Sequence, residues 1–490
     1  MTEKLEKFKQ QLGLLDGTML VAGSMIGSGI FIVTADIARQ VGSSGYLLLT
    51  WIITGIVTVI AALSYGELAG MMPKAGGQYV YINRAYNRLT GFLYGWTVFM
   101  VIQTGTIAAV AVAFARYTSV FLPSWGENNI LFDFGFLKIA SSQVVAIALI
   151  IFLTAINLIG IQGGRIIQLT FTTAKILGLA GLIVAGIYVG LNYDFFAQNF
   201  SNMWDASQLT KDAGGNWVSG SLGGMSLLTA FGLAMVGSLF AADAWNNVTF
   251  IAGEMKNPRK NIPLSLALGT FVVMTIYLLA NVAYLGLLPL HGDPNGTDVV
   301  SRGIQFATND RVGAAAASQI FGNVAVFIMA ALIMVSTFGC NNGLVLAGAR
   351  VYYAMSKDGL FFKRAGHLNQ YGVPQFALII QAVWASVLCL SGTYGDLLDY
   401  ATFASLLFYI VTISGIFILR RKEPEAERPY KVWGYPFLPI IYIIVASAIC
   451  LDWLVFKTTM TGLGLLIVFL GVPVYYFLLN KPQQGTGSSY

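Results

Sequence analysis

The chain has 490 residues, of which 56% are hydrophobic and 10% charged, and its mean hydropathy is +0.71. Because soluble domains carry about 25% charged residues, this composition excludes a soluble protein, with or without a single anchor. The net charge of +6 arises from the loops and indicates no nucleic-acid partner, and three cysteines within apolar segments argue against a disulfide framework.

Apolar segments of about 20 residues, long enough to cross a bilayer, occur along the whole chain. They lie near residues 14–38, 46–72, 91–117, 142–160, 168–191, 226–253, 264–288, 319–347, 375–392, 402–419, 437–455 and 461–480. A charged stretch precedes the first segment and no small-residue cleavage site follows it, so we expect a retained helix rather than a signal peptide. We predict an all-α integral membrane protein of 12 transmembrane helices, with tails at 1–13 and 481–490.

Lysine and arginine residues are divided unevenly between the two sets of loops. Of the 28, twenty fall on the side of the N-terminus and seven on the other side, and Lys175 lies inside an apolar segment. Cytoplasmic loops of membrane proteins carry the excess of basic residues. We therefore predict that both termini are cytoplasmic, and that the chain lies in a plasma membrane, the bacterial inner membrane.

The centre of the first apolar segment, residues 21–31, reads VAGSMIGSGIF. Glycine weakens a helix by roughly 1 kcal/mol relative to alanine, and non-helical backbone at membrane depth occurs only where it faces protein or water. A helix interrupted here would offer free amides and free carbonyls, which suit the carboxylate and ammonium of an amino acid. The alternative is close helix packing, which the spacing Gly23-x-x-x-Gly27 alone favours.

The sixth segment has a second irregular centre, VGSLFAADAWN at residues 236–246. Its residues 237–241 align with residues 23–27, and the two segments enter the membrane from opposite sides. Interrupted helices at matching places in two inverted halves are typical of a transporter site. We therefore predict a break in both helices.

Lys175 is the only basic residue in the interior of an apolar segment, since Arg116 lies at the end of the third. If helix 5 starts near Gln168, Lys175 lies at least ~10 Å inside the membrane. Inserting a lysine at this depth costs about 2.5–3.5 kcal/mol, so such a residue indicates a function. The alternative is a lysine that snorkels to the surface, which is typical of helix ends. Ser336 and Cys340 share a face of the eighth segment at mid-span. The Lys175 ammonium could donate there; interhelical hydrogen bonding without a transport role is the alternative.

Asp243 lies beside the predicted break of the sixth segment. Its carboxylate could bind a cation or a basic substrate, or cap a half-helix, and we expect its backbone carbonyl rather than its carboxylate to act. Tyr284 in the seventh segment, and Phe403 and Phe408 in the tenth, could line a side-chain pocket, although aromatic residues at helical spacing are usually packing.

Five motifs are specific when taken together. They are Ile26-Gly27-Ser28-Gly29-Ile30-Phe31, Tyr65-Gly66-Glu67-Leu68-Ala69, Pro73-Lys74-Ala75-Gly76-Gly77, Trp245-Asn246 with the following Pro258 and Pro263, and RPYKVWGYP at residues 428–436. This set resembles the amino acid–polyamine–organocation (APC) superfamily, and the Trp-Asn pair is similar to its L-amino acid transporter branch and the bacterial relatives of that branch.

The resemblance implies a LeuT-type fold of five plus five helices in an inverted repeat, with helices 1 and 6 unwound at the substrate. The two halves would be residues 14–191 and 226–420, which together form a transport core over residues 14–420. Two further helices would lie within residues 437–480.

By the same resemblance, the amides of Ser28 and Gly29 would hold the substrate carboxylate, and carbonyls of Met25, Phe240 and Asp243 its ammonium, with Phe240 as a gate. The predicted substrate-binding residues are Met25, Ile26, Gly27, Ser28, Gly29, Phe240, Ala241, Asp243 and Tyr284. Lys175 matches a lysine that replaces a sodium ion in sodium-independent members, and Ser336 is predicted to join it. No metal and no cofactor is expected.

Two departures from the family pattern concern substrate and partner. The chain has Ala242 and Ala244 where members commonly have an aromatic residue and a glycine, which leaves substrate size open. Animal relatives carry a cysteine in the loop after helix 3 that joins a glycoprotein heavy chain, and residues 118–141 contain none. We expect no disulfide-linked partner.

We therefore predict a sodium-independent transporter of L-amino acids, neutral ones in the first place, that works by alternating access. Exchange and proton symport both stay open at this point. Alternatives are a cationic amino acid or polyamine transporter of the same superfamily, and a membrane sensor that binds without transport. An enzyme is disfavoured, because no paired carboxylates, metal-ligand cluster or nucleophile with a base lies at membrane depth.

Overall fold

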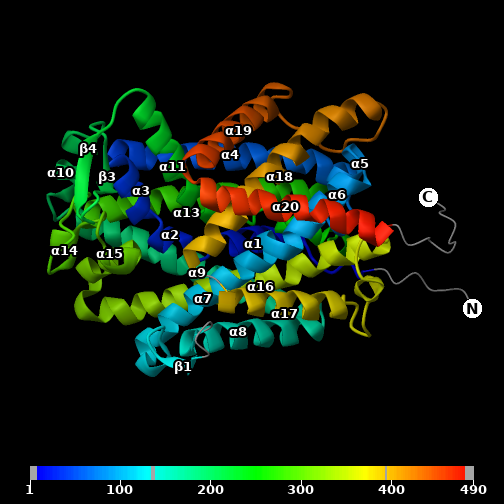
Figure 1. Ribbon diagram of the computed structural model, residues 1–490, viewed down its shortest axis with the longest axis horizontal. Coiled ribbons are helices and arrows are strands. Elements are labelled where there is room, and N and C mark those ends of the chain that lie inside the picture. Colours follow the sequence, from blue (N-terminus) through cyan, green and yellow to red (C-terminus); the bar gives the residue numbers. More distant parts are fainter. Residues whose placement is uncertain (1–7, 134–137, 392–393, 480–490) are drawn as a thin grey trace, which may run out of the picture.

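The computed structural model describes residues 8–133, 138–391 and 394–479, which form a bundle of long helices with two short hairpins (Figure 1). Among these residues, nine helical stretches are long and apolar enough to cross a membrane, and three shorter apolar helices, Met225–Ala241, Gln375–Leu390 and Thr461–Phe477, accompany them. Each lies where an apolar segment was predicted. The predicted all-α membrane fold is confirmed.

In chain order the helices are α1 (Leu14–Met25), α2 (Gly29–Ile32), α3 (Thr34–Val41), α4 (Ser44–Met71), α5 (Gln78–Ala85), α6 (Arg88–Thr97), α7 (Gln103–Phe121), α8 (Ser141–Leu158), α9 (Ile161–Gly190), α10 (Phe195–Ser201), α11 (Met225–Ala241), α12 (Asn247–Phe250), α13 (Pro258–Leu287), α14 (Val299–Arg302), α15 (Val312–Phe321), α16 (Ala325–Lys357), α17 (Gln375–Ser391), α18 (Tyr394–Lys422), α19 (Phe437–Phe456) and α20 (Thr458–Leu479). The strands β1 (Ile130–Asp133) and β2 (Lys138–Ala140) form one antiparallel hairpin, and β3 (Ser207–Lys211) and β4 (Trp217–Ser221) form the other.

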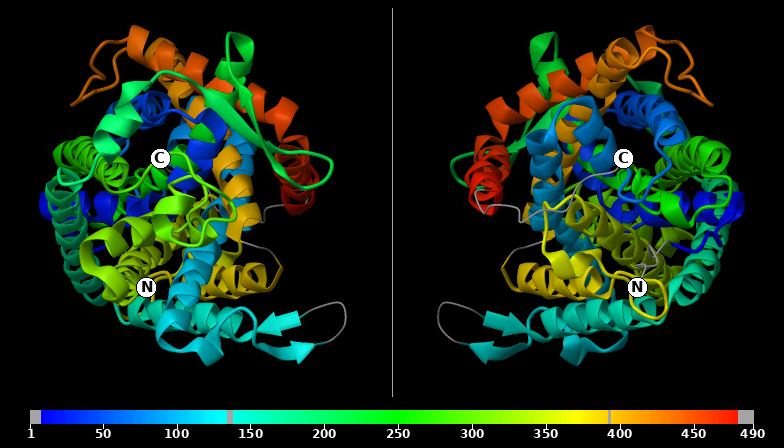
Figure 2. Two further views of the ribbon diagram at one scale, coloured as in Figure 1. Left: turned by 90° about the vertical axis from the view of Figure 1, so that its left-hand side faces the viewer. Right: turned by 90° about the vertical axis from the view of Figure 1, so that its right-hand side faces the viewer.

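The described chain begins and ends at the same end of the bundle, which we call the terminal end (Figure 1). The opposite end, called the hairpin end, carries α10, α14 and the β3–β4 hairpin. The β1–β2 hairpin projects sideways from the bundle (Figure 2).

Both predicted helix breaks are present. Helix α1 ends at Met25, where Ile26 turns to extended backbone (φ −75°, ψ 91°), and the chain becomes helical again at Gly29. Helix α11 ends at Ala241 and the next helical residue is Asn247. The two breaks touch, since a Cβ added to Gly29 would lie 2.7 Å from the Cβ of Ala241.

Gly23 serves the close packing that was weighed as the alternative. A Cβ at this residue would lie 1.8 Å from Nε2 of Gln168 and 2.3 Å from Oγ1 of Thr172, both on α9. The small residues of the first segment therefore do two things: Gly23 lets α9 approach, and residues 26–28 interrupt the helix.

Several helices extend beyond their predicted bounds, and α9 and α16 are two examples. Helix α9 begins at Ile161 rather than near Gln168, and α16 continues to Lys357 rather than ending at residue 347. A prediction from hydropathy ends each segment at the first polar residues. In the structure these polar residues have buried partners and the helix continues: the Arg350 guanidinium, for example, is buried against Glu254 with an N–O distance of 2.9 Å.

Two of the quoted motifs meet at Glu67 of α4. This carboxylate is 1% exposed and accepts hydrogen bonds from Arg420 Nε (2.9 Å), Arg420 Nη2 (2.7 Å) and the amide of Val432 (2.8 Å). The Arg420 guanidinium lies 3.6 Å from the ring centroid of Tyr435. The segment 428–436 is thus tied to α4 and α18 at the terminal end, which is a structural role.

Candidate functional site

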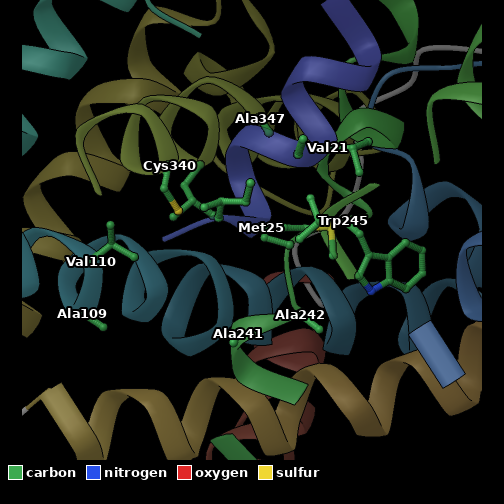
Figure 3. Close-up of a cluster of buried hydrophobic side chains, with 14 of the residues drawn as sticks. Val21, Met25, Ala109, Val110, Ala241, Ala242, Trp245, Cys340 and Ala347 are labelled. Atoms are coloured by element: carbon green, nitrogen blue, oxygen red, sulfur yellow. The ribbon is translucent and has the colours of Figure 1, made fainter. Parts of the chain in front are cut away.

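A small cavity lies between the two interrupted helices. It is lined by Ser24, Met25, Gly27, Ser28, Gly29, Thr106, Val110, Phe240, Ala241, Asp243, Ala244 and Cys340. Met25, Val110, Ala241 and Cys340 come from α1, α7, α11 and α16 and gather around this space (Figure 3). Seven of the nine predicted substrate-binding residues line the cavity, and the two that do not are Ile26 and Tyr284.

Lys175 is fully buried at the middle of α9, 14 residues after its first residue, which corresponds to about 21 Å of helix. Its Nζ donates to the carbonyl oxygens of Gly23 (2.6 Å), Ile26 (2.6 Å) and Ser336 (3.2 Å). An ammonium has three protons to donate, so these contacts use all of them. The lysine holds the end of α1 to α16.

The face of α16 that carries Ser336 and Cys340 points at the same break. Oγ of Ser336 donates to the carbonyls of Ile26 (3.0 Å) and Gly27 (2.9 Å), and Sγ of Cys340 lies 3.0 Å from the carbonyl of Ser24. The Ile26 carbonyl already has two donors, Lys175 and Ser336. This explains why Ile26 lies behind the cavity rather than in its wall.

Asp243 sits in the second break with its carboxylate held by α18. The carboxylate accepts hydrogen bonds from the Tyr409 hydroxyl and from Oγ of Ser405, the latter at 3.1 Å. Both donors are neutral. A second cavity adjoins here on the side of α5 and α12; it shares Thr106, Asp243 and Ala244 with the first and is otherwise lined in part by the polar residues Gln78, Gln103, Asn246 and Asn247.

Sequence reasoning missed Tyr277 of α13. Its hydroxyl lies 3.0 Å from the carbonyl oxygen of Met25 and 3.2 Å from that of Ala241, the last helical residues before the two breaks. The predicted Tyr284 lies two turns further along α13, 3.4 Å from the carbonyl of Ile30. Phe403 and Phe408 are buried and are not among the residues that line the cavity.

Changing Tyr277 to phenylalanine is expected to lower the uptake rate about tenfold, because one hydroxyl proton is shared between both breaks and a lost hydrogen bond costs about 1 kcal/mol, more where a buried acceptor is left unpaired. The rate is measured in reconstituted vesicles. Tyr284→Phe is the matched control and should change uptake by less than about twofold, since its contact of 3.4 Å is long. Equal losses in the two variants would contradict this role for Tyr277.

Comparison with known proteins identifies the family. The amino acid permease family matches residues 12–481, almost the whole chain. The chain belongs to the amino acid permease family. The serine/threonine exchanger SteT of Bacillus subtilis is 30% identical to the permease over 476 residues, which cover 96% of this chain and 98% of the relative.

Mammalian transporters are also similar to the permease. The b(0,+)-type amino acid transporter 1 of Mus musculus is 28% identical over 97% of this chain and 89% of the relative. The large neutral amino acids transporter small subunit 2 of Homo sapiens is 28% identical over 97% and 82%. The resemblance to the APC superfamily is confirmed: the permease is a membrane transporter of amino acids and not an enzyme.

Ala244 of the permease occupies a backbone conformation that favours glycine, with φ +65°. A non-glycine residue in this region costs about 1–2 kcal/mol. We expect Ala244→Gly to raise the free energy of unfolding by up to about 1 kcal/mol, because the greater freedom of glycine in the unfolded chain offsets part of the gain. Thermal unfolding of the purified permease measures this.

Ala242 provides the matched control, since its φ of −88° suits any residue. Ala242→Gly should lower the free energy of unfolding by roughly 0.5–1 kcal/mol. A decrease in both variants would mean that the backbone at Ala244 is unstrained.

Proposed function

We propose that the permease is a sodium-independent exchanger of small neutral L-amino acids that works by alternating access. The observation that carries this is the ammonium of Lys175 on the carbonyls of Gly23, Ile26 and Ser336. Oxygen ligands of this kind are what a hard cation such as sodium would use. A fixed positive charge in their midst satisfies them and repels a second cation, so transport needs no sodium.

The cavity supports binding of the amino acid headgroup at the breaks. As the family resemblance implies, the amides of Ser28 and Gly29, which line the cavity, would bind the carboxylate. Carbonyls of Met25, Phe240 and Asp243 would accept from the ammonium. Oγ of Ser24 is buried at the cavity with no hydrogen-bond partner among the described residues, and offers one more polar contact.

A substrate with a small, neutral side chain fits the rest of the cavity lining best. Val110, Cys340 and Phe240 are among the residues that line the cavity, and Phe240 would act as its gate. The Asp243 carboxylate is held by Tyr409 and Ser405, which supports neutral over cationic substrates. The 30% identity to a serine/threonine exchanger supports the same substrate class and the exchange mechanism.

We also propose the topology that the basic residues predict. Both termini would be cytoplasmic in the bacterial inner membrane, with the hairpin end outside. Residues 14–420 would be the transport core of two inverted halves, 14–191 and 226–420, and 437–480 the two appended helices. All three cysteines are buried, which supports transport without a disulfide-linked partner.

The test is uptake of radiolabelled alanine and serine into sodium-free vesicles that contain the purified permease. Vesicles loaded with unlabelled amino acid should take up label, and empty vesicles should not, with or without an inward proton gradient. Accumulation by empty vesicles only under the gradient would replace exchange with proton symport. Substrate binding without any uptake would indicate a sensor, and a requirement for sodium would overturn the role of Lys175.

A further inference from the structure

The two hairpins of the permease differ in composition and contacts. The β3–β4 hairpin is polar (SQLTK and WVSGS) and is held over the bundle: Gln208 donates to Gln40, and the Arg39 guanidinium of α3 lies 5.9 Å from the ring centroid of Trp217. The β1 strand of the other hairpin reads ILFD, and all of its residues are exposed.

Both faces of β1 are apolar. Ile130, Leu131 and Phe132 are 44%, 43% and 56% exposed. A β-bulge interrupts the register between Ile130 and Phe132, and these two residues pair with the adjacent residues Ala140 and Ile139, so they lie on opposite faces. A hairpin with one face in water and one on protein would alternate polar and apolar residues. Contiguous exposed apolar surface marks a contact with protein or membrane.

The position of this hairpin favours the membrane. It joins the end of α7 at Phe121 to the start of α8 at Ser141. Figure 1 shows β1 beside one end of α8, well short of the far end of the molecule where β3, β4 and α10 lie, and Figure 2 shows it projecting sideways. The neighbouring side chains Phe121, Leu122 and Trp125 are exposed as well, so its apolar surface continues that of the membrane-spanning helices.

We propose that the β1–β2 hairpin is inserted at the boundary between headgroups and acyl chains of the leaflet at the hairpin end, with both faces in lipid. Apolar segments bury about 5–10 Å into this region, where tryptophan and tyrosine are enriched. A hairpin with open strand edges cannot lie in the hydrocarbon core, where no water satisfies its backbone groups, but it can lie in the hydrated interface. The ion pair between Lys138 and Asp133 (3.3 Å) suits the headgroup level.

A second copy of the chain fits the apolar surface of the β1–β2 hairpin less well than lipid does. Stable interfaces bury about 800 Å² per partner, and strands of four and three residues that project alone offer much less. The apolar surface beside the hairpin faces sideways, toward the lipid.

The experiment labels single introduced cysteines with nitrobenzoxadiazole in the full-length permease, reconstituted into phosphatidylethanolamine–phosphatidylglycerol vesicles. Ile130→Cys and Phe132→Cys report the two faces of β1, and Ser219→Cys in the exposed β4 strand is the matched control. The native cysteines are buried, and the unsubstituted permease measures their background labelling. Ile139→Cys on β2 replaces either β1 variant that loses alanine uptake.

Labels at both β1 positions should emit at shorter wavelength than the label at Ser219. A nitroxide near the top of the lipid acyl chain should quench them more strongly than aqueous iodide does, with the reverse order at Ser219. If iodide quenches either β1 label more strongly than the nitroxide does, as expected at Ser219, the proposal is overturned. Protection of the β1 labels from both quenchers would also overturn it, since protein would then cover the hairpin.

Discussion

Replacing Lys175 with methionine is expected to reduce amino acid uptake by about 100-fold, equivalent to about 2.7 kcal/mol at 1.36 kcal/mol per tenfold. Methionine keeps most of the side-chain volume but donates no hydrogen bond. The carbonyls of Gly23, Ile26 and Ser336 lose a charged donor, and such hydrogen bonds contribute about 1.5–3 kcal/mol each. The end of α1 is then no longer fixed against α16, and the cavity loses its shape.

The measurement is the initial rate of alanine exchange in reconstituted vesicles, at equal amounts of monodisperse protein. Lys74→Met is the matched control, because this lysine is exposed at the terminal end, and it should leave the rate within about twofold of the unsubstituted permease. An unchanged rate for Lys175→Met would remove the functional role of the lysine. A rate that recovers in sodium-containing buffer would support its part as a substitute for the ion.

The sequence predicted the fold and the place of the site for identifiable reasons. Composition and segment length determine a membrane bundle, and the glycines and serines near residues 23–29 and 237–241 mark where helix formation is weakest. The distance of Lys175 from the start of its segment predicts that it lies deep, and the cost of an ammonium at that depth predicts that it has a function. These are local properties, which a single sequence contains.

The contacts across the bundle could not be predicted in the same way. Tyr277 and Tyr284 share a face of α13 two turns apart, and only the depth of the breaks decides which of them reaches Met25 and Ala241. The donors that hold Asp243 lie more than 160 residues away on α18. The positive φ of Ala244 has no signal in the residue itself, because non-glycine residues usually avoid this region; the one hint is the glycine that family members commonly have at this position.

Replacing Glu67 with glutamine should lower the free energy of unfolding by roughly 3–5 kcal/mol, the usual effect of removing one partner of a buried ion pair. The buried partner is Arg428, which is 6% exposed and lies 3.5 Å from the carboxylate. Glutamine keeps the shape of the side chain but has no charge and one acceptor fewer. The Arg420 guanidinium, which now makes two hydrogen bonds to the carboxylate, would lose one of them, and the Val432 amide competes for the oxygen that is left.

Glu427→Gln tests whether burial is the cause. Glu427 also pairs with an arginine, Arg259, at 2.7 Å, but the two side chains are 69% and 54% exposed. Exposed pairs contribute about 0–1 kcal/mol, so this variant should unfold at nearly the temperature of the unsubstituted permease while Glu67→Gln unfolds well below it. Equal shifts would mean that charge, not burial, sets the stability of the terminal end. The predicted difference would instead mean that the contact between α4, α18 and residues 428–436 stabilises the core on which amino acid transport depends.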